Sequence, residues 1–405
     1  MKTLRALVML VVIGAIALVL VGCSEDNSAD SAATAEELFG QGLAYLEDSM
    51  ADVNLEEPPW EWDVDTEQAN GYFEDALDID PDHCGALLMA AITRLAMVLQ
   101  DPDLADILEG LFPDDGRGPG GPGDFLFRAF RRPDVYAAAM RLRASGRDDF
   151  PFSELQDFID AEVLPALEYA DGNLLQFEDQ NCVVVLHIEV EEKRETIEFE
   201  IDATDVFLLH APLDALQAVF HIAVSYNVDV DDGQDLQELI DEDPHFLSLR
   251  PGDHMASAYS ELFEMQDHLS DCAWSMSHET DPQDTDLFTN TDDEGWILLG
   301  AGFADTLAAI AEDIYDGLEN GVSFNPAEDT GEPGAPDMEI FIDLWELFND
   351  PLDPITDYFP AHTWLDSTSM EVTEPIYFTD PTFSDITPDM TNEYWGDIYD
   401  WLDEE

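Results

Sequence analysis

Apolar and polar residues follow a helical spacing along most of the chain. In several long segments the apolar residues recur three and four positions apart, which is the pattern of a helix that buries one face. We therefore predict a mainly α-helical fold built from stacked helical hairpins. The helical pattern covers parts of residues 36–112 and then 124–146, 153–176, 205–226, 235–240, 251–277, 296–319 and 338–349.

One segment has the pattern of a β-hairpin instead. Residues 182–190 and 195–202 are rich in β-branched residues, and a polar turn joins them. Two such runs on either side of a short polar turn are typical of paired antiparallel strands. We expect a single β-hairpin at about 182–202, inserted in a helical domain that spans 124–349.

Two further stretches lack any long period. Residues 113–123 are rich in glycine and proline, and their Gly-x-Gly-x-x-Gly spacing follows an apolar helical segment rather than a strand. A phosphate-binding loop needs that strand, so we interpret 113–123 as a surface loop. Residues 350–405 are rich in proline, aspartate, threonine and aromatic residues. We expect them to form an irregular C-terminal extension packed on the helices, because their tryptophans would otherwise be exposed to water.

The start of the chain has the pattern of an export signal. Two basic residues precede an uncharged apolar run at 6–21, which is typical of a secretory signal peptide. The run ends in the sequence Leu20-Val21-Gly22-Cys23. This ending resembles the lipobox of bacterial lipoproteins. The alternative is an ordinary signal peptide that happens to end near a cysteine.

The lipobox resemblance implies that residues 1–22 are removed and that Cys23 carries acyl chains such as palmitate. Several acyl chains anchor a protein stably, whereas a single chain binds a membrane only marginally. Residues 23–35 are rich in serine, alanine and aspartate and predict a flexible tether. Ser24 rather than aspartate follows the cysteine, which favours the outer membrane of a bacterial envelope, on its periplasmic or its surface face.

Small and aromatic residues are regularly spaced within residues 36–112. The positions concerned are Leu38, Gly42, Tyr45, Ala69, Phe73, Ala76 and Pro81. Their pattern resembles a divergent tetratricopeptide unit of about one and a half repeats. The resemblance implies two paired helices with Phe73 between them and a groove that binds a protein or peptide. An insertion with Trp60 and Trp62 separates the two halves, and we expect a loop there that contacts the partner.

The charge of the chain is strongly negative. The sequence contains 93 acidic and 13 basic residues, for a net charge of −80, yet 45% of its residues are hydrophobic and 10% are aromatic. This composition predicts a folded protein with an acidic surface, similar to the proteins of salt-adapted bacteria. Such a surface repels nucleic acids and attracts divalent cations without specificity. We expect salt to stabilise the fold by screening repulsion.

The few arginines are concentrated in one region. Seven of them lie between residues 117 and 147. Arg128, Arg131 and Arg132 are candidate contacts for an acidic partner or for lipid headgroups. The alternative is that these side chains pair with carboxylates inside the protein, where the guanidinium group is preferred.

Three cysteines remain besides Cys23. An oxidising envelope allows one disulfide among Cys84, Cys182 and Cys272, but the sequence does not select the pair. Three buried thiols are the alternative.

Two segments have some features of metal sites. Glu264, His268 and Cys272 share one helical face, as Zn²⁺ or Cu⁺ ligands could, but no local motif supplies a fourth ligand. We interpret them as a core thiol beside a surface histidine–glutamate pair. Residues 227–238 are acidic but place valines where a calcium loop needs oxygen. The sequence predicts no metal site and no cofactor.

The sequence contains no hydrolase motif of the Gly-x-Ser-x-Gly or His-Glu-x-x-His type. We therefore name no catalytic residue. The leading hypothesis is a lipid-anchored, non-catalytic scaffold of the cell envelope that binds a protein or peptide partner in a tetratricopeptide-like groove. A solute-binding lipoprotein of an uptake system is the first alternative, and an envelope enzyme is the second.

Overall fold

The computed structural model describes part of the chain. It covers residues 34–50, 64–100, 156–190, 195–228, 243–278, 288–289, 297–298, 302–324, 340–355, 362–364, 370–372 and 383–384. Several predictions therefore lie outside the described residues. They concern the anchor at Cys23, the loop at 113–123, Trp60 and Trp62, and the arginines Arg128, Arg131 and Arg132.

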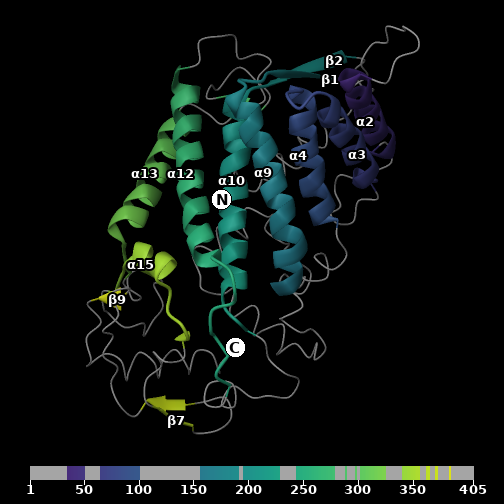
Figure 1. Ribbon diagram of the computed structural model, residues 1–405. Coiled ribbons are helices and arrows are strands. Elements are labelled where there is room, and N and C mark those ends of the chain that lie inside the picture. The colour runs from purple at the N-terminus through teal and green to yellow at the C-terminus, as the bar shows by residue number, and fades with distance from the viewer. Residues whose placement is uncertain are drawn as a thin grey trace, which may run out of the picture. The chain divides into compact units, whose positions relative to one another are not determined.

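The described residues are mainly helical, as predicted (Figure 1). Their α-helices are α2 (Ala35–Met50), α3 (Thr66–Ile79), α4 (Cys84–Leu99), α9 (Leu164–Asp179), α10 (Ala203–Ser225), α12 (His254–His278), α13 (Phe303–Asn320) and α15 (Leu344–Asn349), and a short π-helix, η2 (Ile159–Val163), precedes α9. The N-terminal ends of α3 and α4 are capped by side chains. The Asp65 carboxylate accepts the backbone N–H of Gln68 in α3, and His83 Nδ1 accepts that of Ala86 in α4.

The predicted β-hairpin is present. Strand β1 (Val184–Val190) pairs antiparallel with β2 (Glu195–Ile201), with Val184 opposite Ile201. The remaining strands are two or three residues long. Strands β3 (Phe288–Thr289) and β4 (Ile297–Leu298) pair in parallel. Strand β6 (Ile340–Ile342) pairs antiparallel with β5 (Val322–Phe324) on one side and with β9 (Phe383–Ser384) on the other. Strands β7 (His362–Trp364) and β8 (Met370–Val372) form a further antiparallel pair.

Two predicted helices start later than their apolar pattern suggests. The prediction of helix from 296 is wrong at its start, because β4 lies there and α13 begins only after Gly302, whose φ of +91° favours glycine. The prediction of a helix from 338 is also wrong at its start, because residues 340–342 form strand β6. Helix α15 begins after Asp343, whose carboxylate accepts the backbone N–H of Glu346 at 3.1 Å.

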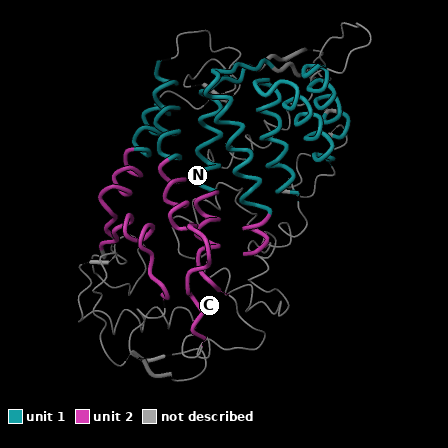
Figure 2. The backbone as a smooth tube through the Cα atoms, in the orientation of Figure 1, with its two compact units in different colours: residues 1–135, 162–216, 264–311 teal, residues 136–161, 217–263, 312–405 magenta. Residues whose placement is uncertain are grey.

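The chain divides into two compact units, coloured separately in Figure 2. Unit 1 comprises residues 1–135, 162–216 and 264–311, and unit 2 comprises 136–161, 217–263 and 312–405. Within unit 1, α2 packs on α3, α3 on α4 and α4 on α9.

The core of the α2–α3 pair is built around Phe73, which is fully buried. A β-carbon at Gly42 of α2 would lie 2.5 Å from its ring, so the missing side chain at residue 42 makes room for the ring. Phe39 lies 5.8 Å from Phe73 between ring centroids, and it faces Gly85 of α4 in the same way. The predicted position of Phe73 between the two helices is confirmed.

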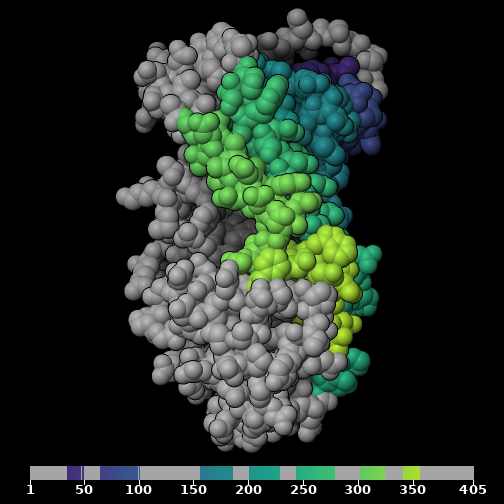
Figure 3. Space-filling view, turned by 90° about the vertical axis from the view of Figure 1, so that its left-hand side faces the viewer, coloured from purple at the N-terminus to yellow at the C-terminus, as the bar shows by residue number. Residues whose placement is uncertain are grey.

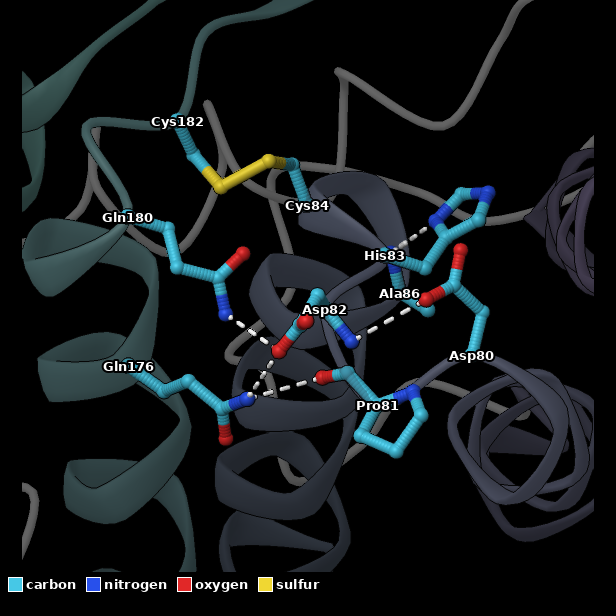
Figure 4. The surroundings of a disulfide bond; sticks show 9 residues. All are labelled: Asp80, Pro81, Asp82, His83, Cys84, Ala86, Gln176, Gln180 and Cys182. Carbon is cyan, nitrogen blue, oxygen red and sulfur yellow. Dashed lines mark hydrogen bonds between the residues drawn. A yellow bond between two sulfur atoms is a disulfide. The ribbon is translucent and has the colours of Figure 1, made fainter.

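A disulfide joins α4 to the loop after α9 (Figure 4). It links Cys84 to Cys182, which decides the pairing that the sequence leaves open. Side chains from the last turn of α9 and from its C-cap residue add hydrogen bonds beside it. Gln176 Nε2 donates to the carbonyl oxygen of Pro81 at 2.9 Å, and Gln180 Nε2 donates to Asp82 Oδ1 at 2.9 Å. These contacts fix the start of α4 against the end of α9.

Unit 2 has an aromatic core around Tyr259. The Tyr259 ring packs on Phe263 and Phe348, and its hydroxyl donates to the carbonyl oxygen of Leu318 at 3.2 Å. Trp345 of α15 is exposed, and Figure 3 shows this helix, in yellow-green, at the surface.

Candidate metal centre

The parts of α9, α10 and α12 that belong to unit 1 bring ligand-type side chains together. Helix α10 contributes His210 and Asp214, one turn apart on the same face. Helix α9 contributes Asp171 and Glu178, two turns apart, and α12 contributes His268. All five belong to unit 1, so the arrangement lies within one compact part of the protein.

The two histidines form the middle of the cluster. Their rings stack with centroids 3.9 Å apart and planes inclined by 17°. His210 is 1% exposed and His268 is 9% exposed. Two positively charged rings in this position would repel each other strongly, because little water screens them. The stack therefore favours at most one protonated ring.

Both ring nitrogens of His210 face carboxylates. Nδ1 donates to Glu178 Oε1 at 2.9 Å, and Nε2 donates to Asp171 Oδ1 at 2.5 Å. Asp214 Oδ1 lies 3.9 Å from Nε2. The carboxylates of Asp171 and Glu178 therefore lie at opposite edges of one imidazole.

His268 lies between two of the same carboxylates. Its Nδ1 donates to Asp214 Oδ2 at 2.7 Å, while its Nε2 lies 3.7 Å from Glu178 Oε2. With a proton on Nδ1, a neutral imidazole has a lone pair on Nε2. This lone pair points to the Glu178 side of the stack and could bind a cation.

The pKa values of the cluster follow from burial and from its charges. Burial lowers the pKa of His210, but the hydrogen bonds with Asp171 and Glu178 outweigh it and raise that pKa to about 10. Burial and the charge of His210 lower the pKa of His268. Burial is also the main reason that the pKa of Asp214 rises to about 8. Near neutral pH the cluster thus holds one imidazolium at His210, one imidazole at His268 and a neutral carboxyl group at Asp214.

One buried oxygen of this cluster has no hydrogen-bond partner among the described residues. The side chain of Asp214 is 0% exposed, and its Oδ1 accepts no hydrogen bond from any residue that the structure describes. Within the same described part of the chain, the ion pairs of Asp171, Glu178 and Asp214 all come from the two imidazoles. A buried carboxylate oxygen without a donor costs free energy. A cation would remove that cost.

The donor atoms fall into two groups that could each hold a metal ion. Glu178, His210 and His268 form one group, and the second consists of Asp171, His210 and Asp214. Within each group, one ligand atom per residue lies within 4.8 Å of the others. A tetrahedral ion with bonds of about 2.0–2.2 Å separates its ligands by roughly 3.4 Å. Small side-chain movements would close the second group around an ion. In the first group the ring of His268 would also have to turn out of the stack, because an ion lies in the plane of each imidazole that binds it.

The sequence prediction for α12 is partly wrong. His268 is buried in the cluster and is not a surface residue, because α10 supplies Asp214 as its hydrogen-bond acceptor. Cys272 is buried, as interpreted, and its thiol donates to the carbonyl oxygen of Thr204 at 3.7 Å. Glu264 is exposed at the edge, with a carboxylate oxygen within 4.8 Å of Asp214.

Four of the five residues, namely Asp171, Glu178, His210 and Asp214, are not among the candidates that the sequence predicts. One signal in the sequence does point to two of them. His210 and Asp214 stand four positions apart in a segment that is otherwise strongly apolar, and helix α10 is long and apolar enough to cross a membrane by length and composition. More than half of its most apolar stretch is buried within the protein, and a core helix passes the same test. Polar ligand-type pairs inside such a helix are uncommon without a role.

A second pair of histidines occurs in unit 2. His221 Nδ1 lies 3.2 Å from His254 Nδ1, and His254 Nε2 lies 3.6 Å from Asp160 Oδ1. Burial, followed by the charge of His254, lowers the pKa of His221 to about 4. The two imidazoles thus lie within hydrogen-bond distance of each other, and the carboxylate of Asp160 lies at ion-pair distance from His254.

Comparisons with protein-family models, with curated proteins and with solved structures find no match for this chain. The geometry of the site is therefore the basis for inferring its function.

Proposed function

We propose that unit 1 binds a divalent transition-metal ion between α9, α10 and α12. The observation that supports this proposal best is the buried stack of His210 and His268 among three carboxylates, with Asp214 Oδ1 lacking a donor. Imidazole nitrogens with carboxylate oxygens suit Zn²⁺, Mn²⁺ and Fe²⁺. Ca²⁺ and Mg²⁺ prefer sites made entirely of oxygen, and Cu⁺ prefers sulfur.

Titration of metal-free protein tests this proposal. Full-length protein in detergent is stripped with a chelator and titrated with Zn²⁺ by calorimetry, in excess Ca²⁺ that occupies the acidic surface. We expect a tight site that Ca²⁺ does not displace. His268→Asn should lower the affinity for Zn²⁺ at least tenfold, because the substitution removes one nitrogen ligand of the ion.

His278→Asn is the matched control, because His278 lies on the same helix but is exposed. It should leave the tight site unchanged. Zn²⁺ binding that Ca²⁺ removes completely, or that both variants weaken equally, would show surface binding only.

We propose further that the chain is a lipoprotein anchored through Cys23 in a bacterial envelope, facing either the periplasm or the cell surface. The lipobox-like ending at residues 20–23 supports this. With a metal ion as the solute, the solute-binding alternative and the metal proposal describe one protein: a lipid-anchored module that captures a metal ion at the membrane.

A second proposed function is that of an envelope scaffold. The packing of Phe73 over Gly42 in the α2–α3 pair supports a tetratricopeptide-like arrangement, since the repeat pattern requires a large ring against small residues there. In this proposal Trp60 and Trp62 contact a protein or peptide partner, and Arg128, Arg131 and Arg132 contact its acidic groups.

Crosslinking in intact cells tests the scaffold proposal. A Trp60→Ala, Trp62→Ala double variant should lose the crosslinked species that the wild-type chain forms. Trp274→Ala is the control, because this indole is 64% exposed on α12 and belongs to no proposed contact. Equal loss in both variants would contradict the assignment of the contact to the insertion.

A further inference from the structure

The ligand atoms of the metal centre divide between two edges of one ring. His210 Nδ1 faces Glu178, and His268 Nε2 lies on that side too. His210 Nε2 faces Asp171 and Asp214 on the other side. His210 belongs to both groups of potential ligands, and its Nδ1 faces Glu178 of the first group while its Nε2 faces Asp171 of the second.

A single ion cannot use all of these donors. The two nitrogens of an imidazole point away from each other, so an ion bound to one cannot reach the other. An ion beside Glu178 leaves Asp171 and Asp214 without a metal, and an ion beside Asp214 leaves Glu178 and His268 Nε2 without one.

We propose that the centre holds two divalent transition-metal ions bridged by the imidazole ring of His210. This inference rests on the proposed function, since it requires that the centre binds metal at all. One ion is bound by Glu178 Oε1, His210 Nδ1 and His268 Nε2, after the ring of His268 has turned out of the stack with His210. The other is bound by Asp171 Oδ1, His210 Nε2 and Asp214 Oδ1, which is the oxygen without a donor.

The charges of this arrangement balance. His210 bound through both nitrogens is an imidazolate, so the two N–H protons that now face Glu178 and Asp171, and the carboxyl proton of Asp214, leave to solvent as the ions bind. Three carboxylates and one imidazolate carry four negative charges, and two divalent ions cancel them.

The spacing of the two ions is also favourable. Metal–nitrogen bonds of about 2.0–2.1 Å at both ends of an imidazolate place the ions roughly 6 Å apart. This separation exceeds the ~3.5–4 Å of carboxylate-bridged pairs, so the repulsion between the ions is smaller. Each ion has three protein ligands, which leaves a coordination position for a small ligand or water.

Native mass spectrometry of the full chain in detergent micelles tests the stoichiometry. Chelator-stripped protein is loaded with Co²⁺ and washed with Ca²⁺ to clear the acidic surface. We expect two retained Co²⁺ ions in the wild-type chain. Glu178→Gln should retain one, and Asp171→Asn should retain one, because each variant removes a ligand of a different ion while preserving side-chain shape.

Glu168→Gln is the matched control on the same helix. Glu168 is exposed and belongs to neither group of ligands, so this variant should retain both ions. The helical circular dichroism of each variant shows whether it has folded. A second measurement, made on the wild-type chain, does not depend on how well the variants fold.

That second measurement is electron paramagnetic resonance after loading with Cu²⁺. An imidazolate bridge couples the spins of two Cu²⁺ ions, so the wild-type signal at low temperature should be weaker than its copper content implies. Glu178→Gln, with one ion, should give the full signal for its copper.

The outcomes separate the two proposals. One retained ion that is lost in both Glu178→Gln and Asp171→Asn would overturn the paired centre and leave metal binding in place. No retained ion would overturn both proposals. Two ions that persist in both variants would place them elsewhere on the protein and would also overturn the paired centre.

Discussion

The ring of Phe73 lies directly over Gly42, so that a methyl group at residue 42 would approach the ring to 2.5 Å. A small-to-large change here forces the two helices apart. Gly42→Ala should lower the free energy of unfolding by about 1–3 kcal/mol, and Phe73→Ala should lower it by about 3–5 kcal/mol because it leaves a cavity. Urea unfolding followed by circular dichroism measures both.

Gly40→Ala is the control for this prediction. Gly40 lies on the same helix, but a methyl group there meets nothing within 4 Å. Alanine favours a helix over glycine by up to about 1 kcal/mol, so Gly40→Ala should stabilise the protein slightly. Destabilisation of similar size at both glycines would mean that packing against Phe73 is not the cause.

The disulfide should contribute strongly to stability. Cys84 and Cys182 are 98 residues apart, and closing so long a loop restricts the unfolded chain. Reduction should lower the free energy of unfolding by about 2–5 kcal/mol, measured by urea unfolding with and without reductant. Cys272→Ser should leave the effect of reductant unchanged. Loss of that effect in Cys272→Ser would contradict the observed pairing.

The histidine pair of unit 2 should make stability depend on pH. The pKa of His221 is about 4 in the folded protein because of burial and the neighbouring His254, and about 6.5 in an unfolded chain. The unfolded state therefore binds more protons between these values. The stabilising effect is complete above pH 6.5 and is lost as the pH falls towards 4.

Melting temperatures between pH 4 and pH 7.5 check this prediction. His221→Asn should melt with a shallower pH dependence than the wild type in that window. His245→Asn is the control, because His245 is exposed and should not change the slope. A wild-type slope that persists in His221→Asn would assign the effect to other groups.

Salt should stabilise the protein. The net charge is −80, and at 1 M salt the screening length is about 3 Å. The melting temperature should rise steadily from dilute buffer to 1 M NaCl, while sucrose of equal osmolality should raise it less. Indifference to NaCl would mean that the carboxylates are already well paired.

The lipobox-like ending makes a separate prediction. Cys23→Ser should abolish labelling of the protein with radioactive palmitate and leave its signal peptide uncleaved. Cys272→Ser should be labelled as the wild type is. Palmitate that persists in Cys23→Ser would refute lipid attachment at this residue.

The sequence predicted those features of the fold that depend on local period. The strands at 184–190 and 195–201 and the position of Phe73 follow from alternation and from small residues at fixed spacing. It did not predict where α13 and α15 begin, since the apolar runs before Gly302 and Asp343 are too short for their periodicity to distinguish a strand from a first helical turn.

The metal centre was not predictable in the same way. Its ligands come from three helices, and each helix supplies one or two residues that are unremarkable in a chain with 93 acidic residues. Only tertiary packing brings His268 to His210 and leaves Asp214 without water. The spacing of Glu264, His268 and Cys272 along one helix therefore predicted a surface position for His268.

The bond between Cys84 and Cys182 also has a consequence for limited proteolysis. The seven arginines at 117–147 all lie within the loop that this bond closes. A single trypsin cut after one of them, other than Arg132, which precedes a proline, opens the backbone but releases no fragment, because the two pieces stay joined through sulfur. A nicked chain would keep its full mass on a non-reducing gel and separate into two bands only after reductant is added.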